Sequence, residues 1–239
     1  MCSLEKRGKV WVLTLGGDDQ QHRLNPPFID SLLSTLSRLT SQANPGSVLL
    51  TTAHGRFFSN GFDLRWARAA SSSSASVDRL HSLVQSLRPV VAALISLPMP
   101  TIAAVNGHAS AAGFLLAASH DYLLMRNGRG VLYMPEVDLG LPLPDYFAAV
   151  MRSKLRSAAV LRDVVLLGKK VQAAEAVNMG IVDSAHDSEE STLEAAMRLG
   201  EQLAQRNWAG EVYADIRKSL YPDICKVLGL THNTIISRI

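Results

Sequence analysis

The feature that most constrains this chain is residues 106–113 (NGHASAAG), a stretch of small residues between a β-type segment and an apolar run. Residues 101–105 (TIAAV) have the composition of a buried strand, and residues 114–118 (FLLAA) that of a buried helix. The stretch between them predicts a turn that leads into a helix. Because residues 111–113 carry almost no side chain, a ligand oxygen can approach the unpaired N–H groups at the helix start. The same residues would also suit a tight packing contact between helix and strand.

A second stretch, residues 55–64 (GRFFSNGFDL), resolves this ambiguity. It also follows a β-type run, residues 48–53, and it opens a helical segment with Asp63 well placed near the helix start. We call residues 55–64 the first turn and residues 106–113 the second turn. Two such turns can direct two backbone N–H groups at one oxygen atom, which is the geometry of an oxyanion hole.

The paired turns resemble those of the crotonase (enoyl-CoA hydratase/isomerase) superfamily, and within it most resemble those of plant peroxisomal Δ3,Δ2-enoyl-CoA isomerases. The matching residues run from about Val10 to Asp183. The resemblance implies an α/β (α+β) crotonase fold with two regions. Residues 1–185 would form a spiral core of repeated ββα units, and residues 186–239 a helical region that mediates trimerisation and ends in a targeting tail.

The resemblance also implies roles for individual residues. In the family, the thioester carbonyl of an acyl-CoA accepts a hydrogen bond from one N–H group in each turn, and the motif positions assign these groups to Ser59 and Ala112. The substrate-binding residues implied in the same way are Arg23, Asn60, Gly61, Asn106 and Gly113. Arg23 would lie along the CoA nucleotide, although a solvated surface arginine is an equal alternative. Asn106 would orient a water or the carboxylate, or would only stabilise the second turn.

The reaction depends on which acid or base faces the acyl chain. Hydratases of this family use two glutamates; the position of the first is Leu115 here, and that of the second is Glu136, which follows Pro135. One carboxylate cannot both activate water and manage the proton, but it can move a proton from C2 to C4 of a 3-enoyl chain. An alternative is Asp145, beside the position where some peroxisomal isomerases carry their glutamate, although Asp145 also suits the start of a helix near Tyr146.

We therefore expect a Δ3,Δ2-enoyl-CoA isomerase of fatty-acid β-oxidation. It would need no metal or redox cofactor, because CoA arrives as part of the substrate. Another reaction with one acid group, such as thioester hydrolysis or decarboxylation, is an alternative. A non-catalytic crotonase scaffold that binds acyl-CoA is another.

Composition bounds the remaining properties. The chain has 239 residues, 47% of them hydrophobic, which suits a globular core of ordinary size, and a net charge of +3 without a basic block that would indicate a nucleic-acid partner. Cys2 and Cys225 form no disulfide framework, and no apolar run is long enough to span a membrane. The family resemblance predicts a homotrimer or a dimer of trimers.

The last residues, Ser237-Arg238-Ile239, differ from the peroxisomal address Ser-Lys-Leu by like-for-like changes. They predict binding to a peroxisomal import receptor and a location in the peroxisomal matrix. A cytosolic protein with an accidental ending is the alternative.

Two patterns bear on the walls of the acyl pocket. Apolar residues recur at helical spacing over residues 77–94, which predicts an amphipathic helix distorted at Pro89. The run Ser71–Ser74 predicts a mobile loop, and we expect residues 67–77 to shape the pocket as a loop. Residues 189–229 predict two or three helices.

Overall fold

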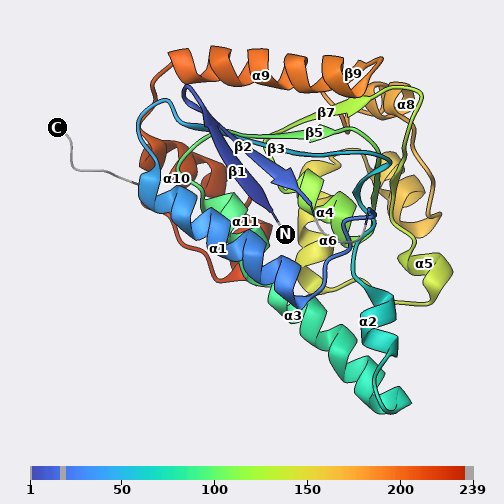
Figure 1. Cartoon of the computed structure of the whole chain (residues 1–239). Helices are drawn as coiled ribbons and strands as arrows, with labels where there is room; N and C mark the ends of the chain where they lie inside the picture. Colours follow the sequence, from blue (N-terminus) through green and yellow to red (C-terminus); the bar gives the residue numbers. More distant parts are fainter. Residues whose placement is uncertain (1, 17–19, 235–239) are drawn as a thin grey trace.

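The computed structural model describes residues 2–16 and 20–234 (Figure 1). Within these residues, six strands form one sheet in the order β1-β2-β3-β5-β7-β9. The strands are β1 (Ser3–Arg7), β2 (Val10–Leu15), β3 (Val48–Ala53), β5 (Thr101–Val105), β7 (Tyr122–Arg126) and β9 (Ser184–His186). β1 is antiparallel to β2, and the other neighbours are parallel.

The predicted ββα repeat is confirmed. β3, β5 and β7 are each followed by a strand of a second, parallel sheet and then by a helix. In the described part of the chain, the second sheet consists of β4 (Phe57–Ser59), β6 (His108–Ser110) and β8 (Leu132–Tyr133). The helices are α2 (Leu64–Arg68), α4 (Ala112–Ala118) and α5 (Glu136–Leu139). Because the strands of the second sheet are parallel, the segments that follow them lie at one edge of that sheet.

The prediction of a plain turn over residues 106–113 was incomplete. Residues 108–110 form β6, which pairs with β4 on one side and β8 on the other. A strand of three residues is too short to show a periodic pattern, so its existence depends on partners that are distant in sequence. The helix predicted after it is confirmed as α4, all of whose residues are buried.

Both faces of the large sheet are covered at its centre, and this explains why β2, β3 and β5 are mainly apolar and buried along almost their whole length. Val10 and Val12 of β2 contact helix α9 (Glu189–Gln205) on one face, whereas Leu13 and Leu15 point into the main core on the other. Figure 1 shows α9 across one side of the sheet, and α1 (Pro26–Gln42) with α3 (Ser73–Ser96) on the opposite side.

The helix predicted over residues 77–94 exists, but it is longer than predicted. α3 begins at Ser73 and continues past Pro89 to Ser96. Ser72 caps its start, since the Ser72 hydroxyl accepts a hydrogen bond from the N–H of Ala75 at 3.1 Å. The prediction of a mobile loop over Ser71–Ser74 was therefore wrong at Ser73 and Ser74, because serine is a favoured residue at helix starts.

The C-terminal region packs on the rest of the chain. Up to residue 234, the helices after β9 are α9, α10 (Gly210–Leu220) and α11 (Pro222–Leu228), in agreement with the predicted two or three. α10 contacts α3, and α11 contacts α6 (Asp145–Lys154). The remaining helical elements are α7 (Ala158–Leu161), the π-helix η1 (Arg162–Leu166) and α8 (Ala173–Asn178). The boundary predicted between residues 185 and 186 falls inside β9. No helix in the described ranges is long and apolar enough to cross a membrane.

A buried arginine of α10 holds the end of α3 against the sheet. Arg217 is 3% exposed, and its Nε and Nη2 donate to the two carboxylate oxygens of Asp121 at 2.7 and 2.6 Å. Its guanidinium also donates to the carbonyl oxygens of Leu94, Ile95, Leu97 and Met99. Burial raises the pKa of the Asp121 carboxyl, but the charge and hydrogen bonds of Arg217 outweigh it and leave that pKa below its usual range. The link positions the helix that forms one wall of the cavity described next.

Candidate active site

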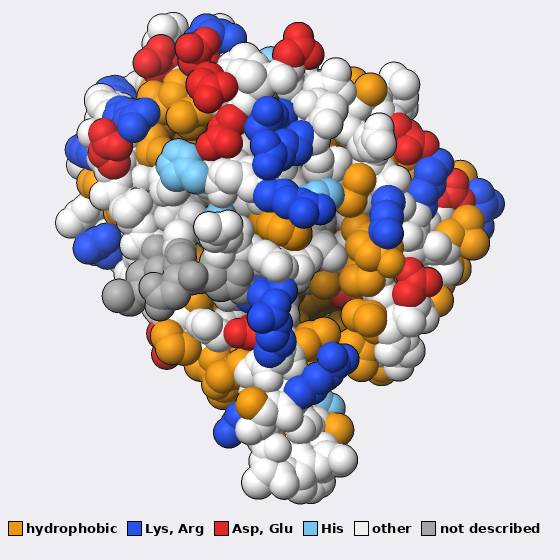
Figure 2. Space-filling view, turned by 45° about the vertical axis from the view of Figure 1, so that its right-hand side comes forward, with side chains coloured by type: hydrophobic (Ala, Val, Ile, Leu, Met, Phe, Trp, Pro, Cys, Tyr) orange, Lys and Arg blue, Asp and Glu red, His pale blue; other side chains and the backbone are white. Residues whose placement is uncertain are grey.

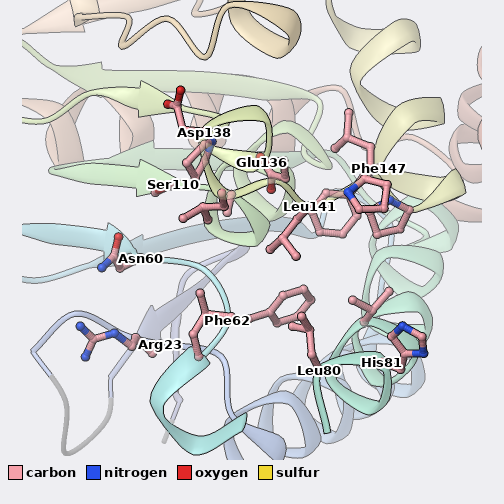
Figure 3. A pocket seen from close by; sticks show the side chains of 18 of the residues that line it. Arg23, Asn60, Phe62, Leu80, His81, Ser110, Glu136, Asp138, Leu141 and Phe147 are labelled. Atoms are coloured by element: carbon pink, nitrogen blue, oxygen red, sulfur yellow. The ribbon is translucent and has the colours of Figure 1, made fainter. Parts of the chain in front are cut away.

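A cavity of about 790 Å³ lies beside the two turns. Figure 2 shows Lys and Arg side chains in a line down one face of the molecule, with hydrophobic side chains beside them. In Figure 3, Arg23, Asn60 and Ser110 lie on one side of the cavity and Leu80 and Phe147 on the other, with Glu136 between the two groups. One end of the cavity is therefore mainly polar, and the other is mainly apolar, with His81 beside Leu80.

Glu136 lies where these two ends meet. It is the first residue of α5 and is 8% exposed, and its Oε2 has no hydrogen-bond partner among the described residues. Burial raises the pKa of its carboxyl group to about 7. A carboxyl group with a pKa near neutrality can both accept and return a proton at physiological pH.

The carboxylates of Asp138 and Asp145 also line the cavity, but both have partners. Asp138 accepts a hydrogen bond from the hydroxyl of Tyr133. Asp145 pairs with Arg88, whose Nη1 and Nη2 lie 2.9 and 3.2 Å from its two oxygens. The hydrogen bond from Arg88 keeps the pKa of Asp145 below its usual range. Asp145 is therefore an ionised and paired group, which favours Glu136 as the proton-transfer residue.

The backbones of the two turns touch at two glycines. Gly61 has φ +75°, and a Cβ atom there would lie 2.8 Å from the carbonyl oxygen of Ser110. A Cβ atom on Gly113 would lie 2.2 Å from the carbonyl oxygen of Ser59. Neither position has room for a side chain, so the close approach of the turns requires glycine at both.

Ser59 lies behind the cavity. It is completely buried and does not line the cavity, and its hydroxyl donates to the carbonyl oxygen of His22 at 2.8 Å. The N–H of the next residue, Asn60, donates to the carbonyl oxygen of Gln21 at 2.9 Å. The structure thus places Ser59 at the contact between the turns, at a distance from the cavity surface.

Phe62 is a site residue that the sequence reasoning missed. It lines the cavity and forms a parallel β-bridge with Leu24. In this bridge the N–H of Leu24 donates to the carbonyl oxygen of Gly61, and the N–H of Asp63 donates to the carbonyl oxygen of Leu24. In such a bridge the central residue's own N–H points away from its partner. The N–H of Phe62 finds no acceptor in the described part of the chain. The sequence feature that could have identified Phe62 is its position directly after Gly61.

In the second turn, Ala112 supplies an N–H group of the same kind. Ala111 has φ 50° and its N–H donates to the carbonyl oxygen of Tyr133 at 2.8 Å. Ala112 begins α4, so its N–H has no acceptor within the helix, and none is found elsewhere in the described residues. Ala112 is completely buried beneath Ser110 and Ala111, which line the cavity.

The remaining predicted residues divide between the cavity and the core. Arg23 and Asn60 both line the cavity and both donate to the side-chain oxygen of Gln21, at 2.5 and 2.7 Å. Asn106 is 1% exposed and does not line the cavity, and its amide donates to the carbonyl oxygen of Gly55 at 3.4 Å. Leu115 is also completely buried away from the cavity. The structure therefore places Asn106 as a link between the turns.

The chain is similar to known proteins over nearly its whole length. The sequence profile described as "Enoyl-CoA hydratase/isomerase" matches residues 5–222. From Arabidopsis thaliana, enoyl-CoA delta isomerase 2, peroxisomal, is 58% identical over 96% of this chain and 96% of its own. Enoyl-CoA delta isomerase 3 from the same plant is 56% identical over 98% of both chains, and enoyl-CoA delta isomerase 1, peroxisomal, is 52% identical over 94% of this chain and 91% of its own.

Solved structures share the fold. An enoyl-CoA isomerase structure from Mycobacterium tuberculosis superimposes with a TM-score of 0.82 at 20% identity, covering 95% of this chain and 94% of the other. An enoyl-CoA hydratase from Bacillus anthracis gives a TM-score of 0.79 at 20% identity, covering 92% of this chain and 81% of the other. The chain therefore has the same overall fold as these proteins.

Proposed function

The chain belongs to the enoyl-CoA hydratase/isomerase family, and we propose that it is an enoyl-CoA delta isomerase that moves the double bond of a 3-enoyl-CoA to the trans-2 position through Glu136. The observation that carries this proposal is the buried carboxyl group of Glu136, which faces the cavity with an oxygen that has no hydrogen-bond partner among the described residues. The high identity to named delta isomerases supports the same reaction.

The proposed reaction moves one proton within the substrate. The ionised carboxylate of Glu136 takes a proton from C2. The electron pair of the broken C–H bond forms a C1=C2 bond, and the electrons of the C1=O bond move onto the thioester oxygen, which gives a dienolate. In the second step C1=O forms again, the C1=C2 electrons form the C2=C3 bond, and the C3=C4 electrons take up the proton from Glu136 at C4, so the carboxylate is regenerated. The reaction calls for no redox cofactor, since no electrons leave the substrate.

The dienolate oxygen needs hydrogen-bond donors. We assign these to the N–H groups of Phe62 and Ala112, because both lie at the contact between the turns and neither has an acceptor among the described residues. One such donor typically contributes about 2.7–4 kcal/mol of barrier lowering. Phe62 replaces Ser59 in this role because Phe62 lines the cavity and its N–H has no acceptor in the described part of the chain, whereas Ser59 belongs to strand β4, which pairs with β6.

The two ends of the cavity suit the two parts of an acyl-CoA. The phosphate-bearing CoA would lie toward Arg23 and Asn60, and the acyl chain toward Leu80 and Phe147 (Figure 3). Assays of the purified protein with 3-enoyl-CoA and 2-enoyl-CoA test the function. Isomerisation without hydration supports it, release of free CoA or CO₂ would indicate a thioesterase or decarboxylase, and binding without turnover would indicate a non-catalytic scaffold.

The pKa of Glu136 predicts the pH dependence. We expect kcat/KM to rise with pH through about 7, because the base must be ionised and burial has moved its pKa to about 7. An exposed glutamate would give the same rise near its ordinary value of 4.5. The measurement is a pH profile of kcat/KM with a 3-enoyl-CoA. A flat profile between about pH 6 and 8 would contradict the assignment.

We further propose that the protein works in the peroxisomal matrix, in β-oxidation. The names of two relatives include the word peroxisomal. The tripeptide Ser237-Arg238-Ile239, the proposed ligand of an import receptor, lies outside the described residues. A fluorescent protein fused to the N-terminus is expected to give punctate peroxisomal signal that is lost when the tripeptide is removed. Diffuse signal from the full-length fusion, or puncta that survive the deletion, would refute this.

A homotrimer, or a dimer of trimers, is proposed from the family. α10 buries Ala214 and Arg217 against the chain's own core, but Ile216 and Leu220 on the same helix remain 56% and 63% exposed. Exposed apolar residues on an otherwise packed helix are compatible with a subunit interface. Light scattering at micromolar protein concentration measures the oligomeric state, and a monomeric mass would refute the trimer.

A further inference from the structure

One wall of the cavity runs from the proton-transfer residue to an ion pair. Glu136 begins α5, an irregular segment follows at residues 141–144, and Asp145 begins α6. Every residue of 141–145 (LPLPD) lines the cavity. Pro142 and Pro144 fix two backbone dihedrals of this segment, so the wall has little freedom to move. A substrate that extends away from Glu136 along this wall arrives at Asp145.

The facing wall is one side of α3. Leu80, Val84 and Arg88 are four residues apart, so they lie along one face of the helix, and all three line the cavity. Eight residues of helix measure about 12 Å. The first two side chains are apolar and the third is a cation. His81 and Gln85 of α3 also line the cavity, so the apolar part of this wall is the row of Leu80 and Val84, and it stops at Arg88.

Arg88 and Asp145 close the space between the two walls. Their contact is bidentate, at 2.9 and 3.2 Å, and Nη2 of Arg88 also donates to the carbonyl oxygen of Val227 in α11. The guanidinium carbon lies 5.6 Å from the ring centre of the buried Tyr146. These contacts tie α3, α6 and α11 together. The Arg88 and Asp145 side chains line the cavity and are also 29% and 56% exposed, so the pair lies between the cavity and solvent.

We propose that the Arg88–Asp145 ion pair is the boundary of the acyl-chain subsite and sets the chain length that the enzyme accepts. This inference rests on the proposed isomerase function and adds the substrate class, which is short- to medium-chain 3-enoyl-CoA. A chain that ends before the pair is covered by apolar side chains. A longer chain has to separate Arg88 from Asp145, which leaves two charges unpaired beside hydrocarbon and is unfavourable.

The test compares kcat/KM for 3-hexenoyl-CoA and 3-hexadecenoyl-CoA in the wild type, Arg88→Met and Asp145→Asn. Methionine keeps an unbranched apolar side chain, and asparagine keeps the shape of aspartate while removing its charge. We expect the long-to-short ratio of kcat/KM to rise at least about tenfold in both variants. This is the size of the change in kcat/KM that one methylene group causes in an apolar pocket. Added salt should raise the ratio in the wild type but not in Arg88→Met, because salt screens an exposed pair.

A matched control is available on the same helices. Arg152 and Asp223 form an exposed ion pair at 3.9 Å that also joins α6 to α11, and neither residue lines the cavity. Arg152→Met is expected to leave the ratio unchanged. An unchanged ratio in both Arg88→Met and Asp145→Asn would overturn the boundary while isomerase activity on 3-hexenoyl-CoA still stands. Failure of the wild type to isomerise either substrate would instead overturn the proposed function.

Discussion

Replacing Glu136 by glutamine is expected to lower kcat for isomerisation by roughly 10²- to 10⁴-fold, the usual contribution of a positioned acid–base group. Glutamine has nearly the same shape, so acyl-CoA binding should remain. The measurement is steady-state kinetics with a 3-enoyl-CoA, together with the dissociation constant of a saturated acyl-CoA. Loss of kcat with retained binding is the expected combination.

Asp145→Asn is the comparison that separates the two carboxylates. Because Asp145 is already paired with Arg88, its replacement should reduce turnover of a short substrate by far less than Glu136→Gln. Near-normal turnover in Glu136→Gln combined with a large loss in Asp145→Asn would move the proton-transfer role to Asp145.

The same glutamine variant has a consequence for stability that does not depend on activity. Burial raises the pKa of Glu136 from 4.5 to about 7, so between these values the folded protein keeps a proton that the unfolded chain has lost. Stability of the wild type therefore falls as pH rises through this window. We expect Glu136→Gln to be more stable by roughly 1–3 kcal/mol at pH 8 and close to the wild type below about pH 4.5. Urea unfolding at the two pH values measures the difference.

Local patterns of this sequence were sufficient for the strands at the centre of the large sheet, since β2, β3 and β5 are mainly apolar runs buried on both faces. The repeating core and Glu136, which follows Pro135, were predicted from the resemblance to the crotonase superfamily. Each of these signals lies within a few neighbouring residues. Such patterns can be recognised from the sequence because they do not depend on which distant segments pack against them.

The parts that were missed depend on partners distant in the chain. The direction of the Phe62 N–H follows from the bridge to Leu24, and the short strand β6 exists only through β4 and β8. The same holds for Arg88 and Arg217, which shape the walls of the cavity. Their hydrogen-bond partners come from other helices and loops. No local pattern distinguishes such an arginine from a solvated one.

Arg217→Met is expected to lower the free energy of unfolding by about 3–5 kcal/mol, the usual effect of removing one partner of a buried ion pair. The variant leaves the Asp121 carboxylate buried without its cation and removes the donor from carbonyl groups at the end of α3. At about 2–4 °C per kcal/mol, the melting temperature should fall by roughly 10 °C. Arg217→Lys is expected to recover little of this stability, because a single ammonium group cannot make the several hydrogen bonds of the planar guanidinium.

Two further variants show whether the loss comes from the buried pair. Arg217→Met combined with Asp121→Asn should recover part of the stability, since asparagine carries no unpaired charge, whereas independent effects would add. Arg152→Met, which breaks an exposed pair at 3.9 Å, should cost less than about 1 kcal/mol. An Arg217→Met variant as stable as Arg152→Met would show that the guanidinium does not hold α3. If it does hold α3, the wall of the acyl cavity owes its position to a residue of the C-terminal helices, and substrate selectivity should weaken along with stability.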